Sequence, residues 1–521
     1  MYQQAETLTP GQSLAGFDIC IVGAGAAGIP MAKRLIGSGK KVLLLVSGQA
    51  RDRGRPEEKR QSIYRGTVGS FLEKVDPIFL DRSRLHMYGG TTNHFGFWSR
   101  PLDPWDFSPR PGYREASWPF ALAELTPYYE AAHAFGHFGP FNYDDLAFWE
   151  RVLYARSFPG QAGDALEPAI MHAQYEESLH DFQIQFGEEL KDAENITVLF
   201  NAHLLKIDSN ASQDEVMQLH CATLENGQKG LSFSVEASSY VLAMGGIENV
   251  RMLKLSGDLG NNEADHLGRG FMVHPLLTHA AKVRFKDGIA TDIRNFFREQ
   301  QVRLNPPKDK GGVYEHVAMP LVNPEYIFDY DVFNAWGILA ASEATLSREK
   351  IGNFRIVLYF LSPDEAIVNL NWEQVPNEAS SISLNLEKRD PVFGQPVSHL
   401  DWQLKYEDKR TAVRALELTE HFLRKHGALS YDYVTDLSGG ADNWTFGPEN
   451  PAALATGDHH MGATRMSETP EDGIVNADAR VHGVNNLYMA GCSIFPTGGY
   501  ANPTLTIVAL SIKLADYLKA L

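Results

Sequence analysis

The chain has 521 residues, more than one hydrophobic core usually holds, so its length predicts two packed domains or one domain with a large insertion. Apolar residues make up 44% and charged residues 21%, which is typical of a soluble globular protein and excludes a disordered or fibrous chain. The net charge of −18 argues against a nucleic-acid partner, because phosphate binding needs clustered Lys and Arg.

The cysteines and the apolar runs indicate the cellular compartment. The three cysteines, Cys20, Cys221 and Cys492, stand singly, which predicts neither a disulfide framework nor a metal site. Residues 1–16 are polar and lack the features of a signal peptide, and no run approaches the ~18 apolar residues of a membrane span. We therefore expect a cytoplasmic protein without a membrane span.

The first elements form a strand, a glycine-rich turn, a helix and a second strand that ends at Val46. Gly23, Gly25 and Gly28 give G-x-G-x-x-G at the first strand–helix junction. The first glycine permits the tight turn, the second lets the backbone approach a pyrophosphate, and the third lets the helix pack on the strand. The pyrophosphate then sits at the helix N-terminus. This unit predicts dinucleotide binding.

The acidic residue that usually contacts the ribose is missing from the end of the second strand, where Val46 and Ser47 stand. Either Ser47, Gln49 or backbone contacts the ribose, or Arg51 or Arg53 contacts a 2′-phosphate. The second alternative would indicate NADP.

The middle of the chain alternates between irregular and regular segments. Residues 51–66 are charged and aperiodic and predict a surface excursion, and residues 86–140 predict an ordered loop over a flat apolar surface. A helix is expected near 174–193, and strands are expected at 196–202, 216–225 and 238–246. The last of these strands begins a second strand-to-turn element.

From 276 to 440 the pattern changes to separated strands with one helix. The strands are expected at 279–285, 354–361, 380–387 and 399–404, and the helix at 409–427. We predict an α/β fold, α+β overall, in which a nucleotide-binding domain (1–275, with its covering loop at 86–140) receives an inserted antiparallel-sheet domain (276–440). Residues 441–521 return to the first domain, ending in strand, turn and helix.

Four segments together resemble the glucose–methanol–choline (GMC) oxidoreductases. They are GAGAAG at 23–28, GGTTNH at 89–94, SSYVLAMGGIENVRMLKLSG at 238–257, and HHMGATRM at 459–466 followed by the stretch 485–510. The chain is most similar to the branch with fructose dehydrogenase, pyranose oxidase and bacterial glycoside oxidoreductases. The resemblance implies a Rossmann-like FAD-binding domain and an inserted antiparallel-sheet substrate domain.

The resemblance also implies the residues that contact FAD. They are Gly23, Gly25, Ala26, Ala27, Gly28, Ser47, Gly89, Gly90, Thr91, Thr92, Asn93, His94, Leu204, Ala243, Gly245, Gly491, Cys492, Pro503 and Thr504. His94 is either bonded covalently to the flavin 8-methyl carbon or packed beside the isoalloxazine. The helix that begins near Pro503 would face the pyrimidine edge of the flavin and stabilise its negative charge when reduced.

His459 matches the catalytic histidine of the family, and a neutral imidazole can accept the hydroxyl proton at operating pH. The adjacent His460 should point to the opposite face of an extended segment. Asn502 matches the second catalytic position, where its amide would hydrogen-bond the substrate oxygen. As an alternative, Asn502 followed by Pro503 is also the pattern of a helix N-cap.

Three further residues receive assignments. Cys492 is expected to be a small buried residue rather than a nucleophile. We assign no catalytic or binding role to His274, in GRGFMVHP. Gln374, in EQVPN, is expected to contact the substrate.

The resemblance implies FAD-dependent oxidation of an alcohol group of a sugar, glycoside or polyol, with hydride transfer to flavin N5. An external acceptor, which is oxygen, a quinone or a redox partner, then takes the electrons. The alternatives are an NADP-dependent dehydrogenase and a non-redox lyase or binding protein on the same fold.

Overall fold

The computed structural model describes residues 1–49, 65–96, 98–110, 113, 117–153, 164–174, 181–261, 264–286, 288–305, 315–316, 332–434 and 453–521. The predicted surface excursion at 51–66 lies outside these residues except for its last two positions. Arg51 and Arg53, the proposed readers of a 2′-phosphate, also lie outside them.

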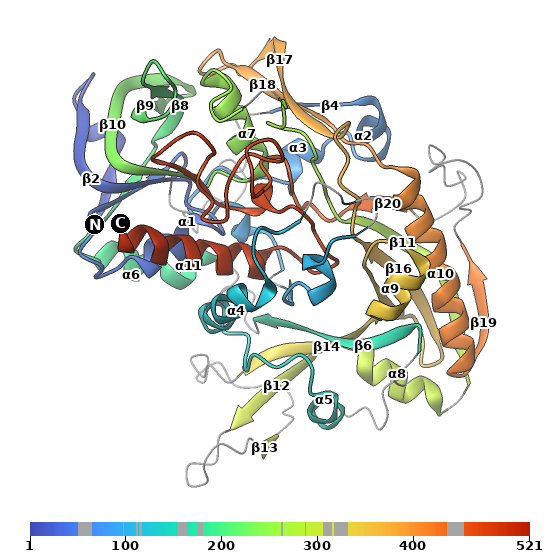
Figure 1. Ribbon diagram of the computed structural model, residues 1–521. Coiled ribbons are helices and arrows are strands. Elements are labelled where there is room, and N and C mark those ends of the chain that lie inside the picture. Colours follow the sequence, from blue (N-terminus) through green and yellow to red (C-terminus); the bar gives the residue numbers. More distant parts are fainter. Residues whose placement is uncertain are drawn as a thin grey trace.

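An eight-stranded sheet forms the nucleotide-binding half of the molecule (Figure 1). Its strands are β1 (Tyr2–Gln4), β2 (Ser13–Val22), β3 (Val42–Val46), β7 (Ile196–Phe200), β8 (His203–Ser209), β9 (Val216–Glu225), β10 (Gln228–Leu242) and β21 (Leu487–Met489). The order is β1-β7-β3-β2-β10-β9-β8, with β21 beside β10. All five residues of β3 are apolar and buried, as expected for a central parallel strand covered on both faces.

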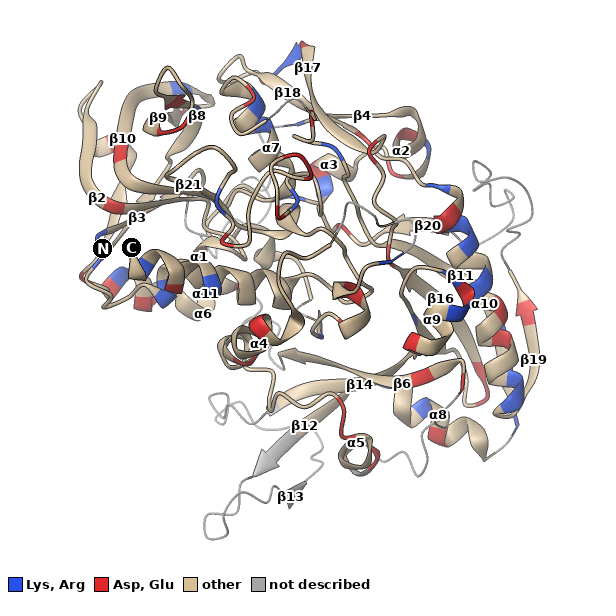
Figure 2. Ribbon diagram, viewed as in Figure 1, with Lys and Arg blue, Asp and Glu red and all other residues tan. Residues whose placement is uncertain are grey.

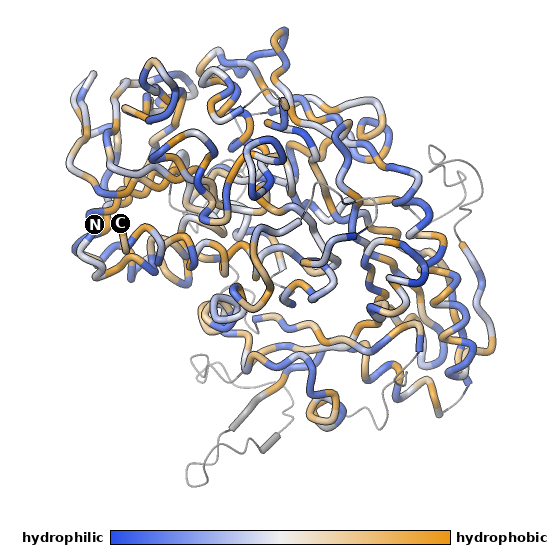
Figure 3. The backbone as a smooth tube through the Cα atoms, viewed as in Figure 1, coloured by the Kyte–Doolittle hydropathy of each residue, from blue (hydrophilic) through white to orange (hydrophobic). Residues whose placement is uncertain are grey.

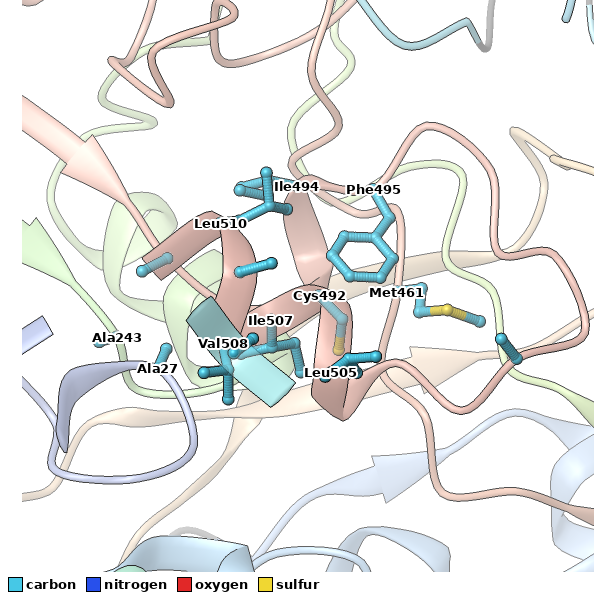
Figure 4. Packing of buried hydrophobic residues seen from close by; sticks show 14 of the residues in the cluster. Ala27, Ala243, Met461, Cys492, Ile494, Phe495, Leu505, Ile507, Val508 and Leu510 are labelled. Carbon is cyan, nitrogen blue, oxygen red and sulfur yellow. The ribbon is translucent and has the colours of Figure 1, made fainter. Parts of the chain in front are cut away.

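Helices cover this sheet. They are α1 (Gly28–Arg34), α4 (Leu122–Gly136), α6 (Phe182–Asp192), α7 (Gly246–Leu255) and α11 (Thr504–Ala520). The last helix is packed against α1 and α4 and is buried along most of its length. Figure 4 shows Leu505, Ile507 and Val508 of α11 in the same apolar cluster as Cys492 and Ala27. The C-terminal helix therefore completes the core that the N-terminal βαβ unit begins.

A ten-stranded antiparallel sheet forms the second half. Its strands are β5 (Trp98–Ser99), β6 (Leu166–Gln174), β11 (Pro275–Phe285), β12 (Gln300–Asn305), β13 (Glu315–His316), β14 (Val332–Ala341), β15 (Phe354–Phe360), β16 (Glu365–Trp372), β19 (Ala428–Tyr433) and β20 (Ala453–Thr456). The helices α8 (Ile289–Phe297) and α10 (Tyr406–Lys425) pack on it. On α10, Lys and Arg alternate with Asp and Glu (Figure 2), while the apolar residues of the sheets and helices gather inside (Figure 3).

This sheet draws on more of the chain than the sequence predicted. The strands β5 and β6 come from the range 1–275, and β20 comes from the range 441–521. The expected strands at 380–387 and 399–404 are β17 (Ser381–Arg389) and β18 (Pro396–Asp401), which instead form a separate sheet with β4 (Thr67–Val68). Strand pairing joins residues hundreds of positions apart, so local pattern does not reveal the partner.

The helix expected near 174–193 is shorter in the structure. Gln174 ends β6, and α6 begins only at Phe182, where the Asp181 side chain accepts a hydrogen bond from the Gln183 amide at 2.9 Å. Residues 175–180 lie outside the described part of the chain.

The remaining helices are short: α2 (Ser70–Val75), α3 (Phe79–Arg82), α5 (Leu146–Val152), α9 (Glu343–Glu349), and the 3₁₀ turns Ala5–Thr7, Gly90–Asn93, Pro104–Phe107 and Cys492–Ile494. Among the described helices, none has the length and apolar character needed to cross a membrane.

Candidate active site

A cavity of ≈ 540 Å³ lies in the nucleotide-binding half, and its volume is within the range of small-molecule and cofactor sites. Its walls come from both ends of the chain: the glycine turn after β2, the end of β3, segments 82–87 and 90–96, the turn after β10, and segments 457–460, 491–492 and 502–504. The segments that resembled the GMC family thus meet around one space.

The glycine turn has the shape that a dinucleotide requires. Gly23 has φ +104°, and a Cβ there would lie 2.5 Å from the Ala243 carbonyl oxygen. A Cβ on Gly28 would lie 1.9 Å from the Gly23 oxygen, so only glycine lets α1 pack this closely. At Gly25 a Cβ would lie in ordinary contact with the backbone of Gly90, 3.8 Å away, on the side that borders the cavity. The turn therefore fits a bound diphosphate.

Most of the residues expected to contact FAD line this cavity. They are Gly23, Gly25, Ala26, Ala27, Ser47, Gly90, Thr91, His94, Leu204, Ala243, Gly245, Gly491, Cys492, Pro503 and Thr504. Gly28, Gly89, Thr92 and Asn93 do not border it. Thr92 donates to the Gly89 carbonyl at 2.7 Å and Asn93 to the Tyr88 carbonyl at 3.0 Å. These side chains shape the loop that carries Gly90, Thr91 and His94.

At the end of the cavity beyond β3, Ser47 borders the space and Gln49 does not. Gln49 instead donates to Glu6 at 3.4 Å. Two arginines that the sequence did not single out, Arg84 and Arg251, also border this space, and Glu248 pairs with both, at 2.6 Å and 3.2 Å.

At the opposite end, His459 faces a second imidazole. Segment 272–275 pairs with segment 456–461 through Met272 with Met461 and through β11 with β20. This pairing places the Nδ1 atoms of His274 and His459 2.6 Å apart. Burial holds the pKa of His274 at about 4 and that of His459 well below 6.5, and each ring also lies near the charge of Arg355. Both imidazoles are therefore neutral at neutral pH.

The hydrogen bonds assign the tautomers. His274 Nε2 lies 3.3 Å from the Gly498 carbonyl oxygen, which can only accept, so Nε2 carries the proton. In a neutral ring Nδ1 of His274 is then an acceptor, and the proton of the 2.6 Å bond belongs to His459 Nδ1. His459 Nε2 is left with a lone pair, as a general base requires.

His460 serves another purpose. Its Nε2 lies 3.0 Å from Ser83 Oγ, and its ring packs edge-on against Phe79. Burial lowers the pKa of His460 to about 3. The two adjacent histidines have different partners, His274 for His459 and Ser83 for His460, but both border the cavity.

Asn502 borders the same end of the cavity, and its Oδ1 accepts a hydrogen bond from Arg355 Nη2 at 2.9 Å. This bond fixes the amide orientation and leaves Nδ2 as the free donor side. The N-cap alternative is wrong: Pro503 is the N-cap of α11, and no side chain caps that helix. The oxygen that would cap the helix is occupied by the guanidinium.

The loop before α11 is held by a buried ion pair. Arg110 binds Glu373 through two bonds of 2.6 Å and 2.9 Å, and the Gly499 amide donates to the same carboxylate at 3.1 Å. The Arg110 charge keeps the pKa of Glu373 low in spite of its burial. Trp118 adds a bond of 2.9 Å to Thr497. These contacts make the backbone that carries Asn502 rigid.

The prediction that Gln374 contacts the substrate is corrected by the structure. Gln374 is 1% exposed and does not line the cavity. Its Oε1 accepts from the Val273 amide at 3.0 Å and from Trp402 at 2.9 Å, and its Nε2 donates to the Gln403 carbonyl at 3.0 Å. Through these three bonds the side chain joins segments of the fold.

Cys492 is buried, as expected, and donates to the His460 carbonyl at 3.2 Å. Burial raises the pKa of its thiol to about 12, so the thiolate is not populated at neutral pH.

Sequence reasoning missed His274 and Arg355. His274 stood in a recognisable segment, GRGFMVHP, but its partner is 185 positions away. Arg355 lies in an apolar strand-like run, FRIVLYFL, and a charged residue in such a run was the available signal.

Comparison with known proteins points to one enzyme family. Residues 376–511 match the family model described as GMC oxidoreductase. The chain is 24% identical to 2-methyl-1,2-propanediol dehydrogenase of Mycolicibacterium austroafricanum, over 96% of the chain and 95% of that protein. It is 25% identical to 6'''-hydroxyparomomycin C oxidase of Streptomyces lividus (98% and 94%) and 22% identical to the fructose dehydrogenase large subunit of Gluconobacter japonicus (96% and 97%).

Solved structures show the same fold. A formate oxidase superimposes with a TM-score of 0.61 at 17% identity, covering 98% of this chain and 99% of that one. A pyridoxine 4-oxidase from Mesorbium loti gives a TM-score of 0.56 at 15% identity, covering 96% and 99%.

Proposed function

Because this chain belongs to the GMC oxidoreductases, which are FAD-dependent enzymes, we propose that it oxidises an alcohol group of a sugar, glycoside or polyol to a carbonyl, with His459 as general base. Relatives matched over nearly their whole length are named for a diol, an aminoglycoside and fructose as substrates. Membership of this family also decides for FAD over the NADP alternative.

The observation that carries the proposal is the lone pair on His459 Nε2. The tautomer set by His274 points the unprotonated nitrogen away from the histidine pair, and the depressed pKa keeps it unprotonated. When bound, FAD supplies the acceptor for the carbinol hydride. His459 takes the hydroxyl proton, so that both hydrogens leave the alcohol and a carbonyl results.

Asn502 holds the substrate oxygen. With Oδ1 committed to Arg355, the amide presents Nδ2 to the cavity, where it donates to the oxygen as negative charge develops on it. The nearby guanidinium adds positive potential in a buried region of low dielectric, which favours the same charge.

His94 is proposed as a flavin contact and as the site of a covalent link. It borders the cavity from the loop that also presents Gly90 and Thr91. Acid precipitation of the purified protein tests the link. Yellow colour retained in the pellet and lost in His94→Ala is expected, and complete release from the unmodified protein would refute the bond.

The proposed reaction is tested by an anaerobic screen of sugars, glycosides and polyols for bleaching of the oxidised flavin band. We expect at least one of these alcohols to reduce the flavin, and His459→Ala to slow that reduction by a factor of about 100 or more. His460→Gln is the matched control, because Gln can keep a donor or acceptor near Ser83. Near-normal reduction in His459→Ala would remove the assignment of the base. Adding oxygen or a quinone afterwards identifies the electron acceptor.

A further inference from the structure

Arg355, on β15, is a buried cation without an anion. It is 6% exposed, and within the described part of the chain its guanidinium pairs with no carboxylate. Its bonds are to Asn502 Oδ1 at 2.9 Å and to Met171 Sδ at 3.8 Å, and its Nε has no partner. Both bonded groups are neutral.

The other buried arginines make the contrast clear. Each pairs with a carboxylate: Arg84 and Arg251 with Glu248, Arg110 with Glu373, and Arg465 with Glu378. A buried charge is costly unless it is paired, and an unpaired one is retained where function requires it. Burial lowers the pKa of Arg355 to about 10, because no carboxylate among the described residues offsets it.

Two more polar groups beside Arg355 are unsatisfied. Asn371 is the direct cross-strand neighbour of Arg355 on β16, and its buried Oδ1 has no hydrogen bond. Tyr500 lies close to Arg355 and is 1% exposed, and its hydroxyl has no hydrogen-bond partner among the described residues. Arg355 Nε, Asn371 Oδ1 and the Tyr500 hydroxyl thus lie together without a partner in the described part of the chain, and a bound polar ligand would satisfy them.

An apolar surface adjoins these groups. Met171, Trp336 and Ile338 form a cluster with Tyr500, and Trp98 packs on it with its ring 4.9 Å from that of Trp336. Met171, Trp336 and Ile338 are buried, so this cluster is part of the core beside Arg355.

The diphosphate of the cofactor is not the missing anion. Arg355 does not border the cavity that holds the glycine turn, so the diphosphate lies elsewhere. Asn502, in contrast, borders that cavity and bonds Arg355 directly. A group bound to Arg355 would therefore sit about one side chain away from the reacting hydroxyl.

We propose that Arg355 binds a carboxylate of the substrate, with Tyr500 and Asn371 as its polar neighbours, so that the alcohol oxidised is a hydroxycarboxylate such as a sugar acid. This inference rests on the proposed function and narrows its substrate class. A guanidinium is suited to this role because its fork of N–H donors matches carboxylate geometry.

The first test measures binding to the holoenzyme without turnover. Acetate and its neutral isostere acetamide are titrated at constant ionic strength, with the flavin absorbance as readout and chloride as a control anion. We expect acetate to bind at least tenfold more tightly than acetamide, and Arg355→Gln to abolish the difference. Equal binding, or no binding of acetate, would overturn the proposal.

A second variant guards against misfolding of Arg355→Gln. Tyr500→Phe removes a hydroxyl that bonds nothing, so the fold should tolerate it. We expect it to weaken acetate binding several-fold. Unchanged acetate affinity in this variant would contradict the assigned position of the carboxylate.

The second test compares glucuronate with glucose in anaerobic flavin reduction. We expect glucuronate to be preferred at least tenfold in the ratio of reduction rate to dissociation constant, and Arg355→Gln to erase that preference. If the variant slows both sugars equally, Arg355 only positions Asn502 and the proposal fails. If acetate binds but glucuronate is not preferred, the site is one for free anions and the proposal also fails. Reduction by neutral alcohols that depends on His459 would leave the proposed function standing in either case.

Discussion

The histidine pair can be tested by removing the acceptor of its hydrogen bond. In His274→Leu the His459 Nδ1–H loses its partner at 2.6 Å in a buried environment. Leaving a buried donor unpaired costs about 1–3 kcal/mol. His459 can recover part of that cost by moving its proton to Nε2, and a protonated Nε2 cannot accept the substrate proton.

The expected kinetic effect follows from this cost. At about 1.4 kcal/mol for each factor of ten, the rate constant of flavin reduction should fall by about 5- to 150-fold in His274→Leu. The assay is anaerobic stopped-flow reduction with whichever alcohol bleaches the flavin of the unmodified protein. Substrate dissociation constants should change little, because His274 is buried behind His459.

His274→Asn provides the matched control. Its side-chain oxygen can lie near the place of the original Nδ1 and accept the same proton, so most of the rate should return. Two results would refute the reasoning: His274→Leu with the reduction rate of the unmodified enzyme, or His274→Asn as slow as His274→Leu.

Other predictions concern Asn502, the glycine turn and pH. Asn502→Asp keeps the acceptor for Arg355 but puts a negative charge where the alkoxide develops, so flavin reduction should slow by about 100-fold or more while the melting temperature is kept; an unaffected rate would contradict the role of Nδ2. In Gly25→Val the new Cβ lies in ordinary contact with Gly90, 3.8 Å away, so the apoprotein should fold, and a steric cost of about 1–3 kcal/mol should weaken FAD binding by about 5- to 150-fold, measured by flavin titration. Because burial depresses the pKa of His459, its base form persists as pH falls through 6.5, so the reduction rate should stay constant from pH 8 to 6; a titration centred near 6.5 would show an exposed imidazole instead.

Part of this site could be predicted from the sequence, because it depends on interactions within a few residues. The turn at Gly23 is required by a backbone conformation that other residues rarely adopt, so its glycines show in the sequence itself. The apolar run that ends at Val46 likewise predicted the second strand of the N-terminal unit, which is β3.

Hydrogen-bond partners that lie far apart in the sequence could not be predicted. The sequence placed Asn502 at a helix start, which is where it lies, but its partner is Arg355 on a strand of the other sheet and not the helix backbone. Gln374 shows the opposite error: a polar residue expected to meet the substrate is consumed by three bonds within the fold.

The sequence alone determined the glycine turn, the position of the expected catalytic histidine and the start of the last helix. Each of these depends on backbone geometry or side-chain chemistry within a few residues. Only the tertiary structure decided that His274 accepts the proton of His459 Nδ1 and that Arg355 has no anionic partner among the described residues. The first depends on β11 and β20, which pair across more than a hundred residues, and the second on a side-chain contact between β15 and the segment before α11. The free energy of such contacts belongs to the whole packed core and not to any local pattern.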